Sequence, residues 1–355
     1  MGRSDSEAQN ARPVVAILGT KKDDPPPGIE AVMESAEVRF ATDGEELKRA
    51  IPGARALFVW DFRARELRDA WDAADALRWV HVAGAGVDAA LFPELTESEV
   101  VLTNSRGVFE RAIAEYVIGL MLVFEKDFLR TMEFQRQKNW KHRESGMLFG
   151  KRLLVVGAGP IGRVISTHAK ALGMKPSAVA RNARSEDPDF ERVFAAGDLD
   201  TALPHADYVV MAAPLTDETK NMFGETRFEK MKSGARFINV GRGATVDEDA
   251  LVEALRERKI SGAALDVFRE EPLPEDSPLW ETPGVMVSPH MSGDFAGRLD
   301  ALGELFAENF RRWRQGEELV NVVDKERGYG RFAPVSSEWR KTTPLTTHRP
   351  TKEDT

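Results

Sequence analysis

Apolar runs bounded by turn residues alternate with segments of helical pattern along most of the chain. The first apolar runs lie at 14–18, 56–60 and 79–82, and helix formers fill 45–50 and 63–74 between them. Short continuous runs of this kind are typical of parallel strands that are buried on both faces. The pattern therefore predicts a first α/β unit whose strands are joined by right-handed helical crossovers.

A second series of the same kind begins after the turn at 104–107. A helical pattern first covers 109 to about 143, and we expect this helix to break near Lys138. Strand patterns then recur at 152–156, 176–180, 207–212, 236–240, 262–265 and 285–288. This alternation predicts a doubly wound parallel sheet. A last helix is expected over 295–315, followed by an apolar run at 319–323 that closes the ordered part.

One strand pattern runs directly into the glycine-rich stretch GAGPIG at 157–162, and a helical pattern follows it. Glycines in this order allow a tight turn and a close approach of the backbone, so the helix N-terminus can bind a pyrophosphate through its free N–H groups. The order of strand, glycine turn and helix therefore predicts a dinucleotide site. The residues predicted to form it are Gly157, Gly159, Pro160, Ile161 and Gly162.

The end of the next strand indicates which dinucleotide is preferred, because an acidic residue there accepts the ribose hydroxyls in NAD-binding proteins. In this chain the strand ends at Ala180, which cannot accept a hydrogen bond, and two arginines follow that could grip a 2′-phosphate. We therefore predict NADP as the preferred cofactor. NAD stays open as the alternative through Asp187 and Asp189, which lie several residues late. The residues assigned to the cofactor here are Arg181, Asn182 and Arg184.

Three later segments each place one polar residue just beyond an apolar run, namely Arg242, Glu271 and His290. Because the carboxyl ends of strands in a doubly wound sheet face one crevice, these side chains can converge beside the cofactor. Arg242 suits a carboxylate bidentately and would polarise a ketone. His290 is the natural proton donor, since the unperturbed pKa of histidine is near ~6.5. Glu271 would favour the charged imidazole and fix its tautomer.

With these motifs in place, the sequence resembles the D-isomer-specific 2-hydroxyacid dehydrogenases over about residues 50–323. The resemblance rests on 157–162, 213–216, 239–243, 264–268, 271–272 and 289–290. It implies that Arg242 orients the substrate, that Glu271 and His290 form the proton relay, and that Asp266 holds the nicotinamide carboxamide. It also implies a backbone loop at 84–88 whose N–H groups receive the substrate carboxylate. The remaining residues assigned on this basis are Trp60, Gly84, Ala85 and Gly86 for the substrate, and Ala213 and Pro214 for the cofactor.

The resemblance implies an α/β fold with a doubly wound parallel-sheet (Rossmann) NAD(P)-binding domain and a second, flavodoxin-like α/β substrate-binding domain. The Rossmann domain is expected at 107–296, and the substrate domain at 13–106 and 297–330. The tails are 1–12 and 331–355. Closure about hinges at 105–107 and 294–297 would expel water before hydride transfer. Pairing of two subunits through the nucleotide domain is implied as well.

Composition narrows the choice of function. The chain of 355 residues is 42% hydrophobic and carries 49 basic and 58 acidic residues, so its formal charge is −9. This balance disfavours a nucleic-acid partner, which would need clustered excess Lys and Arg. There is no cysteine, and no histidine pair has metal-ligand spacing, so no metal is predicted. His81, within an apolar strand pattern, is predicted to be a hydrogen-bonded core residue.

Membrane and export signals are absent from the pattern too. The longest apolar stretch, 117–124, is far shorter than the ~20 residues that a bilayer span needs. The first residues lack an apolar signal core, so a cytoplasmic protein is expected.

The sequence thus predicts an oxidoreductase that moves hydride between NAD(P)H and a small 2-oxo or 2-hydroxy acid. Trp60, the 84–88 loop and Arg181 most resemble the NADPH-dependent glyoxylate/hydroxypyruvate reductases. Two alternatives stay open: a nucleotide-sensing, corepressor-like scaffold of the same fold, and a relative that acts on another substrate such as phosphite. Formate oxidation is disfavoured, because Glu271 stands where a glutamine would be expected.

Overall fold

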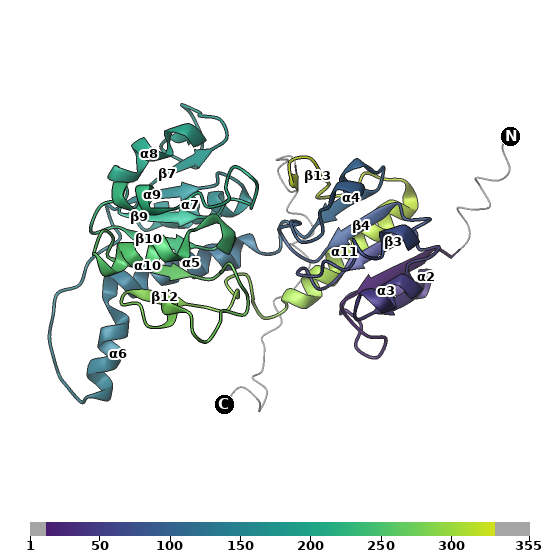
Figure 1. Ribbon diagram of the computed structural model, residues 1–355, viewed down its shortest axis with the longest axis horizontal. Helices are drawn as coiled ribbons and strands as arrows, with labels where there is room; N and C mark the ends of the chain where they lie inside the picture. Colours follow the sequence, from purple (N-terminus) through teal and green to yellow (C-terminus); the bar gives the residue numbers. More distant parts are fainter. Residues whose placement is uncertain (1–11, 331–355) are drawn as a thin grey trace. The chain divides into compact units, whose positions relative to one another are not determined.

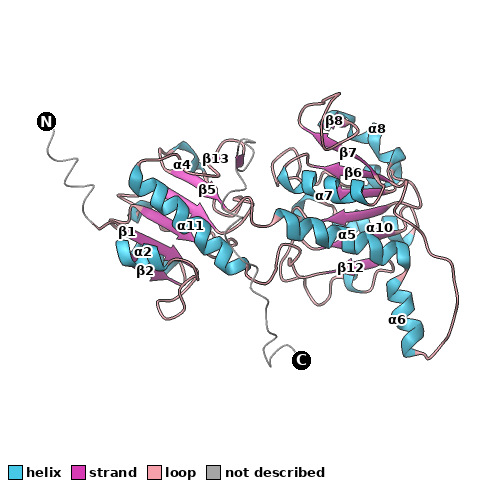
Figure 2. Ribbon diagram, turned by 180° about the vertical axis from the view of Figure 1, so that it is seen from behind, coloured by secondary structure: helices cyan, strands magenta, loops and turns pink. Residues whose placement is uncertain are grey.

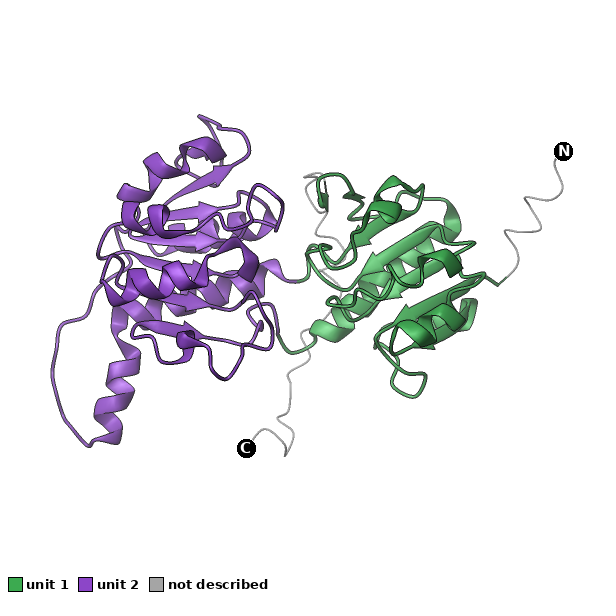
Figure 3. Ribbon diagram, viewed as in Figure 1, with its two compact units in different colours: residues 1–108, 295–355 green, residues 109–294 purple. Residues whose placement is uncertain are grey.

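The computed structural model describes residues 12–330, which form two compact units. Unit 1 contains the chain up to Val108 and again from Phe295, and unit 2 contains Phe109–Asp294 (Figure 3). The predicted domain boundaries at 106/107 and 296/297 each lie two residues from these divisions. The predicted tails fall almost entirely outside the described residues.

Unit 1 is built on a five-stranded parallel sheet in the order β2-β1-β3-β4-β5. This is the flavodoxin-like order, and its switch point lies between β1 and β3. The strands are β1 (Val14–Leu18), β2 (Glu37–Ala41), β3 (Ala56–Val59), β4 (Trp79–Val82) and β5 (Val101–Asn104). The helices are α2 (Glu30–Ser35), α3 (Gly44–Ala50), α4 (Pro93–Glu97) and α11 (Arg298–Gln315), and a short hairpin joins β13 (Val323–Asp324) to β14 (Tyr329–Gly330).

The chain returns from unit 2 to complete the core of unit 1. The α11 side chain Phe306 is fully buried and stacks on Phe58 of β3, with ring centroids 4.1 Å apart, and on Trp79 of β4 at 5.2 Å. Figure 2 shows α11 lying across the strands of this sheet. Burying large aromatic side chains stabilises a core strongly. The last helix is therefore an integral part of the first unit, although more than 180 residues separate it from that unit's strands.

His81 of β4 lies wholly inside this core. Its Nδ1 is 2.7 Å from the hydroxyl of Thr103, which accepts a hydrogen bond from the Trp79 indole, so Thr103 donates to Nδ1. Its Nε2 is 3.2 Å from the hydroxyl of Ser105, which itself donates to the Val82 carbonyl, so Nε2–H is the donor. Burial lowers the pKa of His81 to about 3. The prediction of a hydrogen-bonded core histidine is confirmed.

Unit 2 is a seven-stranded parallel sheet in the order β12-β11-β10-β9-β6-β7-β8. Its strands are β6 (Arg152–Val156), β7 (Lys175–Ala180), β8 (Val193–Ala195), β9 (Tyr208–Met211), β10 (Arg236–Asn239), β11 (Gly262–Leu265) and β12 (Val285–Val287). The order reverses between β6 and β9, so the carboxyl ends of these two strands mark the topological switch point. The fold-class prediction is confirmed for both units.

Helices cover both faces of the unit 2 sheet (Figure 1). They are α5 (Glu110–Lys126), α6 (Phe128–Arg136), α7 (Pro160–Ala171), α8 (Leu199–Ala202), α9 (Glu225–Lys230) and α10 (Glu248–Arg256). The helix α10 shows how the sequence sets such an element. Asp247 caps it by accepting from the Ala250 amide, and the side chains of Leu251, Val252 and Leu255 are buried at helical spacing.

The prediction of a helix over 63–74 is wrong. This segment forms a series of turns that ends in one short 3₁₀ helix, η1 (Trp71–Ala73). Its buried side chains are Ala64, Leu67 and Ala70, which recur every third residue. A spacing of three matches the 3₁₀ repeat, whereas an α-helix would need alternating steps of three and four.

The long helix predicted over 109–143 is also wrong in its extent. It breaks at Asp127 rather than near Lys138, and the second part, α6, ends at Arg136. Asp127 adopts the left-handed conformation with φ of 50°, which aspartate tolerates better than most residues. The Arg143 guanidinium donates to the carbonyl and the carboxylate of Asp127 and stabilises the break. The chain from 137 to 150 is not helical.

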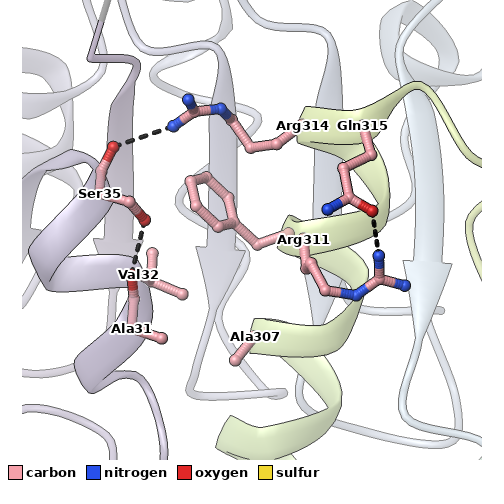
Figure 4. Close-up of a pocket in the computed structure, with 8 residues that line it drawn as sticks. Ala31, Val32, Ser35, Ala307, Arg311, Arg314 and Gln315 are labelled. Carbon is pink, nitrogen blue, oxygen red and sulfur yellow. Dashed lines mark hydrogen bonds between the residues drawn. The ribbon is translucent and has the colours of Figure 1, made fainter.

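Unit 1 also contains a cavity of about 330 Å³ between α2 and α11. Figure 4 shows that Arg314 reaches across it and donates to the Ser35 carbonyl. None of its lining residues is a predicted site residue.

Within residues 12–330, no helix has the length and apolar character of a membrane span, and no group of three possible metal ligands comes together. The cytoplasmic location and the lack of a nucleic-acid partner stay predictions.

Candidate active site

The glycine loop between β6 and α7 is shaped to receive a dinucleotide. Gly157 has φ of 116°, and a Cβ there would lie 2.8 Å from the Ala213 amide nitrogen. A Cβ on Gly162 would collide with the Gly157 carbonyl, whereas the space next to Gly159 is open. Gly159 is the N-cap of α7, and no side chain caps that helix. The free N–H groups of the first turn can therefore bind a pyrophosphate, and the residues present fit an NAD(P) cofactor.

Beyond β7 the predicted cofactor residues Arg181, Asn182 and Arg184 are all exposed. The acidic alternatives are occupied elsewhere, because Asp187 and Asp189 both accept from Arg163 of α7. Burial alone would raise the pKa of Asp187, but hydrogen bonds from Arg163 bring it below its usual value. Its side chain is only 3% exposed. Asp187 and Asp189, the two carboxylates on which the NAD alternative depended, are therefore engaged in a local ion-pair network.

Ala213 and Pro214 follow β9, on the other side of the switch point from the glycine loop. Ala213 is buried against Gly157, and Pro214 is exposed. Thr219 stabilises this turn by donating to the Pro214 carbonyl at 2.7 Å and accepting from the Thr216 amide at 2.8 Å. Both predicted residues therefore lie at the carboxyl edge where ligands bind in such sheets.

Arg242 lies just beyond β10 in a turn whose backbone is held from two sides. The buried Asn239 accepts from the Gly241 amide at 3.0 Å and donates to the Arg242 carbonyl at 3.1 Å. Thr245 donates to the same carbonyl at 2.6 Å. A Cβ on Gly243 would collide with the Phe268 backbone, so the turn packs directly on the segment that follows β11. The base of the Arg242 side chain is consequently rigid.

Glu271 and His290 form the pair that the sequence predicts. His290 Nδ1 lies 2.7 Å from Glu271 Oε2, and the side chains are 21% and 22% exposed. The other carboxylate oxygen, Oε1, accepts from the Phe268 amide at 3.0 Å. The carboxylate is thus oriented by its own loop, and Nδ1 is the ring nitrogen of His290 that faces it.

His290 has a left-handed backbone with φ of 54°, a conformation that costs a non-glycine residue roughly 1–2 kcal/mol. Asp266 offsets that cost. Its Oδ1 accepts from the Met291 amide and the Ser288 hydroxyl, and its Oδ2 accepts from the Ser292 amide, at 2.7–2.9 Å. Asp266 is 1% exposed. It therefore anchors the His290 loop to β11, and its contact with the nicotinamide carboxamide stays a prediction.

The substrate residues predicted in unit 1 lie at the carboxyl ends of two neighbouring strands. Trp60 follows β3, and its ring meets Phe58 edge to face at 5.5 Å. Gly84 follows β4 and is buried under Phe62, where a Cβ would lie 2.9 Å from the Phe62 Cβ. Ala85 and Gly86 are partly exposed. The structure thus brings these four residues to one edge of their own sheet.

Sequence reasoning missed the residues that hold the site residues in place. Asn239 lies in the 239–243 motif, but no role was predicted for it. No role was predicted for the Ser288 hydroxyl either. The only signal was a polar residue at the buried end of a strand pattern. Such a residue needs hydrogen-bond partners, but the sequence does not show which partners it has.

Known proteins share both the sequence and the fold. The model described as "D-isomer specific 2-hydroxyacid dehydrogenase, NAD binding domain" matches residues 118–292, all within unit 2. A glyoxylate reductase of Thermococcus onnurineus is 32% identical over 325 residues, covering 87% of this chain and 96% of the relative. The chain belongs to the D-isomer-specific 2-hydroxyacid dehydrogenase family. A second glyoxylate reductase, from Korarchaeum cryptofilum, is 32% identical over 73% of this chain and 79% of its own length.

Solved structures agree with this assignment. A family member from Aeromonas salmonicida has 31% identity and a TM-score of 0.75, covering 89% of this chain and 100% of its own. An NADPH-dependent glyoxylate/hydroxypyruvate reductase from Sinorhizobium meliloti, solved with NADP and sulfate, has 26% identity and a TM-score of 0.76 over 90% of this chain and 100% of its own. This D-2-hydroxyacid dehydrogenase is accordingly an NAD(P)-dependent oxidoreductase, and the predicted family and enzyme class are confirmed.

Proposed function

We propose that this dehydrogenase reduces small 2-oxo acids such as glyoxylate or hydroxypyruvate and prefers NADPH as the hydride donor. The observation that carries the proposal is the 2.7 Å pair of His290 and Glu271, which lies at the same sheet edge as Arg242 and the glycine loop. The names of the relatives support the substrate class. Unit 2 serves as the nucleotide domain, and unit 1 serves as the substrate domain.

In the proposed reaction, each site residue has a separate role. Bound NADPH supplies the hydride. Arg242 binds the substrate carboxylate and polarises the carbonyl, where its fixed charge stabilises the developing alkoxide. His290 donates the Nε2 proton to the carbonyl oxygen, while Glu271 holds the opposite nitrogen and stabilises the positive charge of the ring before transfer. In the oxidative direction the same imidazole accepts the proton. Within unit 1, we assign the backbone N–H groups of the 84–86 loop to the substrate carboxylate and Trp60 to substrate binding.

The exposed Arg181, Asn182 and Arg184 support the NADPH preference. The Ala180 side chain offers no acceptor to a ribose hydroxyl, and Arg163 occupies the acidic groups farther along the chain. A 2′-phosphate would gain charge-assisted hydrogen bonds from the arginines. Three structural relatives were solved with NADP or NADPH, including the reductase from Sinorhizobium meliloti.

The function is tested by a panel of 2-oxo acids with the purified protein. We expect NADPH to be oxidised with glyoxylate or hydroxypyruvate about tenfold faster than NADH at equal concentration, because one charge-assisted hydrogen bond contributes ~1.5–3 kcal/mol. Phosphite with NADP⁺ is included as a separate arm. The proposal is refuted if no 2-oxo acid supports oxidation of either cofactor, or if phosphite alone is turned over.

We also propose that two subunits pair through unit 2. The helix α6 and the chain that follows it project from the body of this unit (Figure 1). No side chain of α6 is buried, and large apolar side chains are exposed along it and beyond it. They are Phe128, Leu129, Met132, Trp140, Met147 and Phe149. Several large exposed apolar side chains on a projecting segment are typical of a protein interface, and Trp140, which is 100% exposed, would be the largest anchor.

Light scattering on a size-exclusion column tests the pairing. The wild-type protein is expected to elute as a dimer, and the double variant Leu129→Glu, Trp140→Glu is expected to elute as a monomer, because charged groups would be buried in the interface. Leu299→Glu, a change at an exposed apolar residue of unit 1, serves as the control and should leave the mass unchanged. A monomeric wild-type protein, or a double variant of unchanged mass, contradicts the proposal.

A further inference from the structure

The loop that is proposed to receive the substrate carboxylate is braced by the last residues of β5. Asn104 donates from Nδ2 to the Ala85 carbonyl at 2.6 Å, and the Ser105 amide donates to the Gly84 carbonyl at 2.9 Å. Asn104 is only 5% exposed. Two consecutive carbonyl groups of the loop are therefore directed toward the 104–105 segment.

These two hydrogen bonds also set the direction of the loop's N–H groups, because the peptide bond is planar. In a planar trans peptide the C=O and the N–H of the next residue point in opposite directions. The only cis peptide bond among the described residues precedes Pro272, so the loop peptides are trans. Holding the carbonyls of Gly84 and Ala85 consequently turns the N–H groups of Ala85 and Gly86 away from the 104–105 segment.

These two N–H groups are available to a ligand. Within residues 12–330, neither the Ala85 nor the Gly86 amide donates to a backbone or side-chain acceptor. Both residues are partly exposed. Two adjacent, oriented N–H donors form a concave site for an anion such as a carboxylate.

Asn104 is itself held from the opposite side. The Asn321 side chain donates to the carbonyls of Asn104 and Arg106, at 3.2 and 2.7 Å, and the Asn104 amide donates to the Asn321 carbonyl. The Asn104 side-chain oxygen accepts from the Arg106 amide at 3.3 Å. Asn104 therefore has a fixed position from which its one long-range donor reaches the loop.

We propose that Asn104 is a positioning residue that orients the Ala85 and Gly86 N–H groups toward the carboxylate of the substrate. The inference rests on the proposed function, because that function places a carboxylate at this loop. Asn104 acts through the loop backbone and does not touch the reacting atoms. Its loss should therefore weaken carboxylate binding more than it slows hydride transfer.

The test compares Asn104→Ser and the near-isosteric Asn104→Leu with the wild-type protein. Serine is too short to reach the Ala85 carbonyl, and leucine lacks the donor. In both variants the KM for glyoxylate and the inhibition constant for oxalate should rise about tenfold, the change that ~1.4 kcal/mol produces and that one lost hydrogen bond can account for. The kcat should stay within about threefold of the wild-type value, and NADPH affinity, measured by fluorescence, should not change.

Asp43→Ala is the control. Asp43 caps α3 of the same unit by accepting from the Glu46 amide at 2.9 Å, so its hydrogen bond stays within that helix. Its loss should lower the melting temperature without moving the oxalate constant. The inference is overturned if the wild-type enzyme is active but both Asn104 variants keep the wild-type KM and oxalate constant, or if Asp43→Ala shifts them equally. A wild-type protein without activity would overturn the proposed function and the inference with it.

Discussion

Replacing His290 by asparagine is expected to lower the kcat for 2-oxo acid reduction by about 10³-fold, the scale of general acid catalysis by a positioned side chain. Asparagine is chosen because it tolerates the left-handed backbone that residue 290 adopts, with φ of 54°. The Asp266 bonds to the Met291 and Ser292 amides can then persist. The loss would therefore report the missing proton donor and not a collapsed loop.

The measurements are steady-state kcat, NADPH affinity and the melting temperature. NADPH affinity should stay within about twofold of the wild-type value, since the glycine loop on β6 and α7 is untouched. His168→Asn on α7 is the matched control and should keep full activity. If His290→Asn retained more than about a tenth of the wild-type kcat, His290 would not be the proton donor, because such a small loss lies below the range of general acid catalysis.

Replacing Arg242 by lysine is expected to lower kcat/KM for glyoxylate by about 10²–10³-fold, the cost of removing one donor from a site that stabilises a developing oxyanion. Lysine keeps the charge but not the planar fork that matches a carboxylate. The turn that holds residue 242 depends on Asn239 and Thr245, whose bonds go to backbone groups and remain in the variant. The variant also loses the 2.9 Å hydrogen bond from the Arg242 guanidinium to the Gly241 carbonyl, so the melting temperature is measured beside kcat/KM.

Arg227→Lys provides the comparison for Arg242→Lys. Arg227 also lies in unit 2, where it donates to Asp200 at 3.0 Å as part of a surface ion pair. Exposed pairs of this kind contribute only ~0–1 kcal/mol to stability, so activity should be nearly unchanged. Equal losses in the two variants would mean that Arg242 acts through stability and not through the substrate.

Much of the fold could be predicted because its signals are local. A continuous apolar run such as Val14–Leu18 can be stable only when both faces are covered, so it indicates a buried parallel strand without further information. The prediction failed at segments whose burial depends on the elements that pack next to them. Glu37–Ala41 has an exposed or half-buried residue at four of its five positions, and this edge strand was not predicted.

The sequence alone determined which residue types follow each strand: the glycine turn after β6, the arginine after β10, and the acid and imidazole after β11 and β12. These features are local, since a residue type and its distance from an apolar run can be read directly from the sequence. Only the tertiary structure decided which groups hold them. Arg163 donates to Asp187, Asp266 accepts from the His290 loop, and Asn104 donates to Ala85. The partners are separated by 19–26 residues in the sequence. Such pairings depend on which strands lie side by side, and hydrophobic periodicity carries no information about that order.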